Sequence, residues 1–536
     1  MVETQSIFPI VSELPEQHQP PVCHQRSYLI NGEIKTWKGD VKSVQSPVYT
    51  SENGKLAPVN LGHFPLLDEA EAEKALAAAE QAYNKGQGEW ATMKVKDRLS
   101  CMETFIEKMK VQREAVVRML MWEIGKTESD SAKEFDRTVE YIQDTIDAVK
   151  DMNRKAAKLE LEQGVYAQIR RGPIGVVFCM GPYNYPLNET FATLIPALIM
   201  GNSTILKPAK YGVLLLEPLL KAFKESFPAG VVNIIYGKGS LLGNYLLGTG
   251  RIHVLAFIGS TRVANVLKKQ HPKPNRLRTV FGLEAKNPAI VMNDCDIDAT
   301  AKECMLGALS YNGQRCTALK IIWVHEDIAA EFIQKLKQNI AASKVGMPWE
   351  NPQITPLPEP DKPAYLQELV NDATSKGAEL IIPHGKDDEA SMVYPKLLVG
   401  VNSEMKVYHE EQFGPVVPIA TFSSLQEPID YLTNSPYGQQ ASLFSDNHET
   451  IANLIDPLVN QVCRLNINSQ CQRGPDVYPF NGRKDSAEGT LSVSDALRQF
   501  SIRTLVAAKN TSTNKRIISS IYQERSSNFM STDFIL

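Results

Sequence analysis

The stretch GPIGVVFCMGPYNYPLNETFATLIPALIMGNSTILK, residues 172–207, decides the expected fold. It contains a strand-like run at Gly175–Met180, a helical run at Glu189–Ile199 and a second strand-like run at Ser203–Leu206. A strand, a helix and a strand in this order are typical of a βαβ unit with two parallel strands. The alternation continues with a helix at Leu214–Ser226 and strand-like runs at Val231–Tyr236 and His253–Ile258. The pattern predicts an α/β fold built on a parallel, doubly wound sheet.

A second set of alternating segments follows further along the chain. Its strands are expected at Ala289–Met292 and Lys320–Val324, and its helices at Ile297–Tyr311 and Ile328–Ala342. These segments predict a second α/β domain. Before the first set, residues 68–153 have the spacing of helices, and Asp68 is placed to cap the first of them. Residues 158–171 alternate polar and apolar side chains around Gly164, which predicts a half-buried strand pair.

Composition excludes several classes of protein. The chain has 536 residues, 43% of them hydrophobic, and a net charge of −4. Its apolar runs are shorter than the roughly 20 residues that span a bilayer, and the small charge gives no reason to expect nucleic acid or a membrane as partner. The eight cysteines form neither a disulfide framework nor a pattern with zinc spacing, so no metal is expected. No signal peptide is apparent, and we expect a cytoplasmic protein.

One cysteine lies in a context that suggests chemistry. The segment Asn312-Gly313-Gln314-Arg315-Cys316-Thr317 places a thiol in a glycine-containing loop beside an arginine. Positive charge close to a cysteine favours the thiolate, which is the nucleophilic form. A lone cysteine is more often a buried structural residue, so the assignment of Cys316 as a nucleophile depends on the motifs around it.

Several motifs, in order and at suitable spacing from Ser27 to Val506, together resemble the aldehyde dehydrogenase superfamily. They are Gly172-Pro173-Ile174-Gly175, Pro182-Tyr183-Asn184-Tyr185-Pro186, Lys207-Pro208-Ala209, Phe257-Ile258-Gly259-Ser260-Thr261, Lys286-Asn287-Pro288-Ala289, Gly313-Gln314-Arg315-Cys316 and Glu411-Gln412-Phe413-Gly414-Pro415. The resemblance implies two doubly wound α/β domains and a small β arm that joins subunits into a homo-oligomer, a dimer or a tetramer. The expected divisions are a flexible N-terminal arm at 1–25, a cofactor-binding domain at 26–157 and 172–281, oligomerisation strands at 158–171 and 482–507, a catalytic domain at 282–481 and a C-terminal tail at 508–536.

The resemblance implies a role for each catalytic residue. Cys316 attacks the aldehyde carbon, and the side chain of Asn184 donates to the resulting oxyanion together with the Cys316 backbone N–H. Hydride transfer to a nicotinamide then leaves a thioester that water hydrolyses. The alternative for Asn184 is a turn residue before Tyr-Pro.

The chain departs from the family at the base that activates this water. Family members usually carry Glu-Leu-Gly-Gly-Lys, where this chain has Gly282-Leu283-Glu284-Ala285-Lys286. An ungapped alignment puts Gly282 in the base position, whereas a loop shorter by two residues puts Glu284 there. We favour Glu284 as the base. The alternative is that Glu284 is a surface charge and the base lies elsewhere.

The expected cofactor is NADP, with NAD as the alternative. Lys207 ends a predicted strand, where α/β folds place ligands, and Gly259 and Ser260 open a helix whose N–H groups could hold pyrophosphate. The turn containing Gly239 is a weaker glycine signal. Lys210 stands where many NAD-using relatives have glutamate, and a lysine would attract a 2′-phosphate. The resemblance also assigns to the cofactor site Pro182, Glu411 at the nicotinamide ribose, and Phe413 beside it.

Three further segments resemble the non-phosphorylating, NADP-dependent glyceraldehyde-3-phosphate dehydrogenases. They are 309–318, 436–442 and Arg473-Gly474-Pro475-Asp476-Val477-Tyr478-Pro479-Phe480. A phosphorylated aldehyde needs cationic donors. The expected substrate residues are Arg137, Tyr185, Arg315, Thr317 and Arg473, with Arg503 as a further candidate. The alternatives are a dehydrogenase of another small aldehyde, such as lactaldehyde or a semialdehyde, and a non-catalytic binding protein on this fold.

Overall fold

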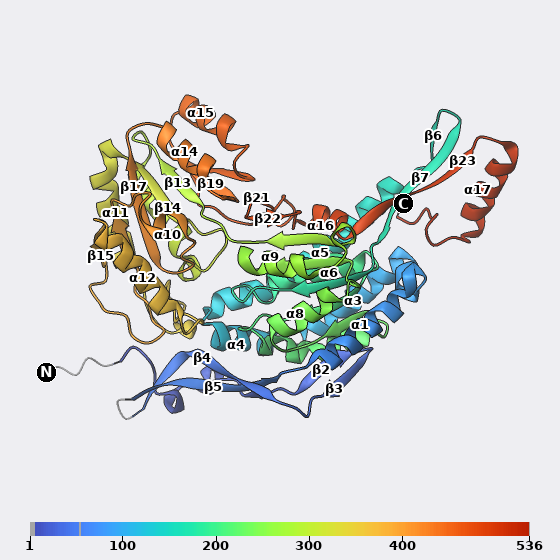
Figure 1. Cartoon of the computed structure of the whole chain (residues 1–536), viewed down its shortest axis with the longest axis horizontal. Coiled ribbons are helices and arrows are strands. Elements are labelled where there is room, and N and C mark those ends of the chain that lie inside the picture. The colour runs from blue at the N-terminus through green and yellow to red at the C-terminus, as the bar shows by residue number, and fades with distance from the viewer. Residues whose placement is uncertain (1–5, 53–54, 535–536) are drawn as a thin grey trace.

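A computed structural model describes residues 6–52 and 55–534. Figure 1 shows two α/β lobes, a long hairpin along the bottom of the view and a strand arm projecting at the right. The first lobe contains an eight-stranded sheet of order β22-β12-β11-β8-β9-β10-β2-β3. Its central strands run parallel, as residues 172–207 predict. The bounds are β2 Ser27–Ile30, β3 Glu33–Thr36, β8 Val176–Met180, β9 Ser203–Lys207, β10 Val232–Ile234, β11 Val254–Ile258, β12 Arg278–Gly282 and β22 Ala487–Glu488.

Helices pack on this sheet, and the apolar side chains of helices and strands together form one core. Asp68 caps the first long helix as expected, since its side chain accepts a hydrogen bond of 3.0 Å from the Glu71 N–H. The helices of this lobe are α1 Glu69–Tyr83, α2 Glu89–Thr92, α3 Val95–Lys110, α4 Arg113–Ile124, α5 Glu128–Ala156, α6 Asn188–Ile199, α7 Leu220–Ser226, α8 Gly239–Gly248 and α9 Thr261–Gln270.

The second lobe contains a seven-stranded sheet of order β15-β16-β17-β14-β13-β19-β20, parallel except for its edge strand β15. This arrangement confirms the predicted second α/β unit. Its strands are β13 Pro288–Val291, β14 Ile321–His325, β15 Glu379–Ile381, β16 Lys396–Val399, β17 Val416–Phe422, β19 Gln440–Phe444 and β20 Arg464–Ile467, with β18 Tyr437–Gly438 paired to β21 Arg483–Lys484 beside them. Its helices are α10 Ile297–Leu309, α11 Ala329–Ala341, α12 Lys362–Ser375, α13 Lys406–His409, α14 Gln426–Asn434 and α15 His448–Leu458.

The arm is a three-stranded antiparallel sheet. It consists of β6 Glu160–Glu162, β7 Val165–Pro173 and β23 Ser501–Lys509. The expected second segment of the arm, 482–507, is only partly right. Within 482–500, β22 joins the sheet of the first lobe and α16 Val493–Gln499 packs against α5 and α6. The strand itself starts at Ser501 and runs two residues beyond the expected end.

Both chain ends differ from the flexible segments expected from their polar composition. In the part of residues 1–25 that the structure describes, Phe8 is buried and β1 Cys23–His24 pairs with β5 Lys55–Pro65, which forms the long hairpin with β4 Val41–Glu52. At the other end, residues 512–524 form helix α17, and Met530 is buried. A few buried apolar side chains hold these segments against the rest of the protein. The average composition of a segment does not show which single residues will be buried.

Across residues 6–52 and 55–534, no helix is both long enough and apolar enough to cross a membrane.

Candidate active site

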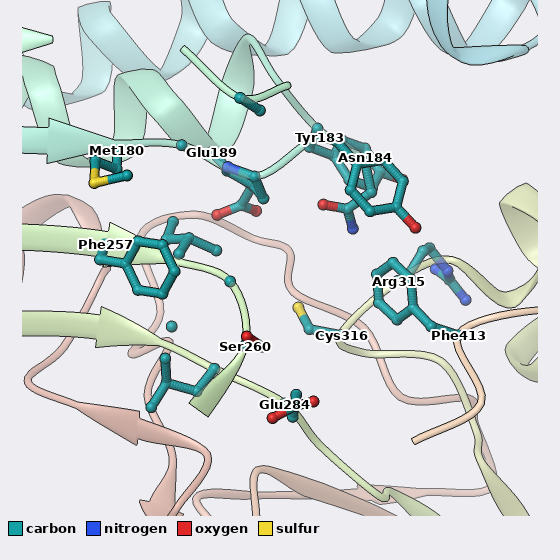
Figure 2. Close-up of a pocket in the computed structure, with 18 of the residues that line it drawn as sticks. Met180, Tyr183, Asn184, Glu189, Phe257, Ser260, Glu284, Arg315, Cys316 and Phe413 are labelled. Atoms are coloured by element: carbon teal, nitrogen blue, oxygen red, sulfur yellow. The ribbon is translucent and has the colours of Figure 1, made fainter. Parts of the chain in front are cut away.

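A cavity of about 1010 Å³ collects residues from both lobes around Cys316. All residues predicted for the site line it except Gly239 and Arg503. Gly239 lies close by, since a Cβ there would be 3.6 Å from the Cε of Lys207. Figure 2 shows Cys316 near the centre, with Asn184 and Glu189 on one side of it and Glu284 on the other. The lining residues that sequence reasoning proposed are Arg137, Pro182, Asn184, Tyr185, Lys207, Lys210, Gly259, Ser260, Glu284, Arg315, Cys316, Thr317, Glu411, Phe413 and Arg473.

A tight loop presents Cys316. After α10 ends, Tyr311, Asn312 and Gly313 have φ values of 48°, 57° and 72°, three successive left-handed residues. Such a conformation costs of order 1–3 kcal/mol for a non-glycine residue and persists where neighbours hold it. Asn312 supplies that support, because its side chain donates to the Thr355 hydroxyl at 3.0 Å and accepts from the Thr355 N–H at 2.9 Å. Gly313 fits because any Cβ there would be 2.7 Å from the Ala308 carbonyl oxygen.

The Cys316 thiol is protonated at rest. Its pKa is raised to about 11, mainly by burial and also by the negative charges of Glu189 and Glu411, while the positive charges of Lys320 and Arg473 oppose the rise. A thiol with this pKa is a weak nucleophile at neutral pH. Attack on an aldehyde therefore requires transfer of the thiol proton to another group or a change of charge when ligands enter.

Asn184 lies across from Cys316 on the loop that leads into α6. Its side-chain nitrogen donates to the Gln314 carbonyl at 2.8 Å. An amide nitrogen has two N–H groups, so one remains for an oxyanion in the cavity. The backbone carbonyl of Asn184 accepts 2.8 Å from the Nζ of Lys126. This geometry suits the predicted oxyanion donor.

A fully buried ion pair supports this loop. Lys126 pairs with Glu134, and neither side chain is exposed. Glu134 also accepts hydrogen bonds from the N–H groups of Leu187 and Asn188, at 3.0 and 3.1 Å. Burial lowers the pKa of Lys126, and Glu134 opposes that shift. The Lys126 Nζ lies 3.6 Å from the ring centroid of Tyr185, so the pair supports both the backbone of Asn184 and the ring of Tyr185.

The two carboxylates proposed from the sequence both accept hydrogen bonds from other parts of the protein. Glu284 accepts a hydrogen bond of 2.9 Å from the Thr261 N–H, at the start of α9. Glu411 accepts 2.8 Å from the Nζ of buried Lys320 and 3.2 Å from the Ala285 N–H. Burial raises the pKa of Glu411, and Lys320 lowers it. Glu284 thus lies where the predicted pyrophosphate cradle begins.

The cofactor side of the cavity is rich in ammonium groups. Lys207 ends β9, its Nζ donates 2.7 Å to the Pro208 carbonyl, and burial lowers its pKa to about 8. Burial lowers the pKa of Lys42 on β4, and the charges of Lys210 and Lys238 lower it further, so these three lysines lie near one another. Mutual repulsion among them would be relieved by a phosphate dianion. Of these three lysines, only Lys210 is among the residues that line the cavity.

Two of the three predicted phosphate arginines are paired with acids. Arg137 makes two hydrogen bonds of 2.7 Å to Asp476. Arg473, 7% exposed, forms ion pairs with Glu189 and, at 3.2 Å, with Asp476. Arg315 donates to the Gly307 carbonyl at 3.2 Å and to Gln470 at 3.3 Å.

The further candidate Arg503 is wrong as a substrate residue. It lies on β23 of the arm, opposite Arg171 on β7, and it does not line this cavity.

Comparison with known proteins assigns the family. The model of the aldehyde dehydrogenase family matches residues 51–506. The chain belongs to the aldehyde dehydrogenase family. An NADP-dependent glyceraldehyde-3-phosphate dehydrogenase from Streptococcus equinus is 32% identical over 500 residues, covering 91% of this chain and 98% of the relative. A malonate-semialdehyde dehydrogenase from Bacillus thuringiensis is 28% identical over 473 residues, covering 87% and 94%.

A solved structure agrees with this assignment. The NADP complex of the NADP-dependent glyceraldehyde-3-phosphate dehydrogenase from Bacillus halodurans superposes with a TM-score of 0.83 at 29% identity, covering 92% of this chain and all of that one. The predicted fold class and the assignment of this aldehyde dehydrogenase as an NAD(P)-dependent oxidoreductase are confirmed.

Glu189 is the main site residue that sequence reasoning missed. It is the only charged residue of α6, a helix whose residues are all buried. A carboxylate within so apolar a helix is itself a signal, because charged side chains are almost never buried without a partner. That partner, Arg473, comes from the other lobe and cannot be located from local sequence.

Proposed function

We propose that this aldehyde dehydrogenase oxidises glyceraldehyde 3-phosphate to 3-phosphoglycerate with NADP. The observation that carries the proposal is the presence of three arginines, Arg137, Arg315 and Arg473, in one cavity with Cys316. The relative from Streptococcus equinus, named for this substrate and cofactor, supports it.

In the proposed reaction the Cys316 sulfur adds to the aldehyde carbon, and Asn184 donates its free N–H to the oxygen that gains charge. The thiol proton passes to this oxygen to give the thiohemiacetal and is released to solvent when the hydride leaves. NADP accepts the hydride when it is bound. Lys207, Lys210 and Ser260 would hold its adenosine and phosphate groups, and Glu411 its nicotinamide ribose. The cluster of Lys42, Lys210 and Lys238 fits a cofactor with an additional phosphate.

The oxidised carbon then remains on Cys316 as a thioester, which water hydrolyses. From the sequence, Glu284 is the residue expected to activate this water. We place the reaction in the cytoplasm, where the eight free cysteines would stay reduced.

A second candidate substrate class is favoured by a specific observation. Glu189 and Asp476 neutralise Arg473 and Arg137, so the charge available for a phosphate is smaller than the arginines alone suggest. A small aldehyde without phosphate, such as lactaldehyde or a semialdehyde, fits such a cavity.

Kinetics with an aldehyde panel test the proposal. Glyceraldehyde 3-phosphate, unphosphorylated glyceraldehyde, lactaldehyde and malonate semialdehyde would each be assayed with NADP and with NAD. We expect the highest kcat/KM for glyceraldehyde 3-phosphate with NADP. A higher value for an unphosphorylated aldehyde would assign the second substrate class, and no oxidation of any aldehyde would indicate a non-catalytic binding protein.

We further propose that the arm joins subunits into a homo-oligomer. Ile502 and Leu505 on β23 are 51% and 56% exposed, an apolar surface that a second copy could cover.

A further inference from the structure

We propose that Glu189 is the general base that activates the water for thioester hydrolysis. The inference rests on the proposed function, because it presupposes the thioester on Cys316. Its first support is the position of the carboxylate. Glu189 lines the cavity of Cys316, and Figure 2 shows its carboxylate directed into the space toward which the Cys316 sulfur points.

The charge of Glu189 acts on the thiol of Cys316 itself. Two carboxylates, Glu189 and Glu411, raise the pKa of the Cys316 thiol, and Glu189 has the larger effect. Glu284 raises the pKa of Glu411 instead, from the other side of the cavity. A general base must reach the attacking water before its proton affinity matters.

Three other glutamates of the cavity also have partners. Glu411 is occupied by Lys320 and the Ala285 N–H, and Glu284 by the Thr261 N–H. Glu359 accepts the Tyr183 hydroxyl at 2.6 Å and pairs with a lysine at 3.1 Å. In each of these carboxylates the contacts fall on a single oxygen, Oε1 of Glu411 and Oε2 of Glu284 and of Glu359. A free oxygen therefore does not distinguish them from Glu189, whereas the direction of the Glu189 carboxylate toward the Cys316 sulfur does.

Glu189 is held firmly and still has one oxygen available. Arg473 pairs with its Oε2, whereas its Oε1 has no hydrogen-bond partner within residues 6–52 and 55–534. Its backbone N–H donates to the Tyr185 carbonyl at 3.1 Å, so base and oxyanion donor lie on one loop and the helix turn that follows it. A rigid unit therefore presents Asn184 and Glu189 to the same carbonyl.

The step balances as an ordinary hydrolysis. Water oxygen adds to the thioester carbonyl carbon while Glu189 accepts one water proton, and Asn184 donates to the oxyanion. Collapse of this adduct breaks the carbon–sulfur bond and releases the acid and the Cys316 thiolate. The proton on Glu189 then passes to the thiolate, which restores the resting thiol that the pKa of about 11 requires.

Hydrolysis of 4-nitrophenyl acetate by the full-length enzyme tests the step without any cofactor. This ester acetylates a reactive cysteine and releases nitrophenolate, after which turnover depends on hydrolysis of the acetyl thioester. For Glu189→Gln we expect a retained burst of one nitrophenolate per chain and a steady-state rate lower by about 100-fold, the usual minimum contribution of a general base. Intact mass should show the acetyl group accumulating, and peptide mapping should place it on Cys316.

Further variants separate a base from a structural role. Glu80→Gln is the matched control, because it breaks a carboxylate–arginine pair with Arg251 outside the cavity. The hydrolysis rate of the wild type should fall at low pH, and this limb should be absent in Glu189→Gln. If Glu189→Gln does not fold, Glu189→Asp keeps the charge with a shorter reach and should show the same retained burst with slow hydrolysis.

Three results would overturn the proposal. They are a steady-state rate of Glu189→Gln equal to that of the wild type, loss of the burst in a folded variant, and slow hydrolysis in Glu284→Gln with normal hydrolysis in Glu189→Gln. Failure of the proposed function looks different: the wild type would hydrolyse the ester through Cys316 but oxidise no glyceraldehyde 3-phosphate.

Discussion

Removal of the buried Lys126 ammonium should destabilise the protein strongly. In Lys126→Met, Glu134 would keep its charge in a site with no exposure, compensated only by the Leu187 and Asn188 N–H groups. Breaking a buried pair in this way costs about 3–5 kcal/mol. Replacing Glu134 by Gln in the same chain removes the charge but keeps an oxygen for both N–H groups. The double variant should therefore recover most of the lost stability.

Loss of the Lys126 ammonium should also slow catalysis. The Asn184 carbonyl loses its charged donor, and a hydrogen bond to a charged group contributes about 1.5–3 kcal/mol, or roughly 10–100-fold in rate if it is needed only to hold the oxyanion donor. We expect kcat to fall at least 10-fold in the double variant with KM nearly unchanged.

Urea unfolding and steady-state kinetics measure the two effects. Lys108→Met is the control, because it breaks an exposed pair with Glu225, and exposed ion pairs contribute little to stability. The reasoning is refuted if Lys126→Met loses no more stability than this control, or if the double variant is as unstable as the single one.

Three other outcomes follow from the site. Cys316→Ala should abolish aldehyde oxidation while thermal unfolding is unchanged, and substantial residual oxidation would remove the mechanism. Lys210→Glu should lower kcat/KM with NADP relative to kcat/KM with NAD, because the new carboxylate repels a 2′-phosphate. An unchanged ratio would show that the lysine cluster does not discriminate between the two cofactors. The rate of Cys316 alkylation by iodoacetamide should rise with pH, with a midpoint near 11, because burial is the main cause of the raised pKa of this thiol. Arg473→Gln should move this midpoint upward, because a positive charge that stabilises the thiolate is lost. A midpoint at or below the ordinary cysteine value of about 8.5 would contradict the burial argument.

Local patterns predicted the helices and strands well, and they pointed to two residues that line the cavity. The segment 172–207 folds into β8, α6 and β9 because strand and helix periodicities are properties of a few consecutive residues. Cys316 and Asn184 were identified through short motifs, and both line the cavity. Residues whose role depends on distant partners were not accessible in this way.

Charge pairing shows why the remainder could not be predicted. Arg137 and Arg473 are recognisable as cationic residues, but their acids could be assigned only once the lobes were assembled. The polar ends of the chain were likewise expected to be flexible, whereas single apolar residues such as Phe8 and Met530 bury and hold them.

Glu189 connects substrate choice with hydrolysis. In the structure it shares Arg473 with Asp476, so a substrate phosphate that binds this arginine must compete with two carboxylates. If the phosphate displaces Glu189 from Arg473, the carboxylate gains a second free oxygen at the moment when a thioester is present. An unphosphorylated aldehyde would leave the pair intact and the carboxylate held. The charge pattern therefore favours slower hydrolysis, rather than slower thioester formation, for unphosphorylated substrates, and burst kinetics would separate the two steps.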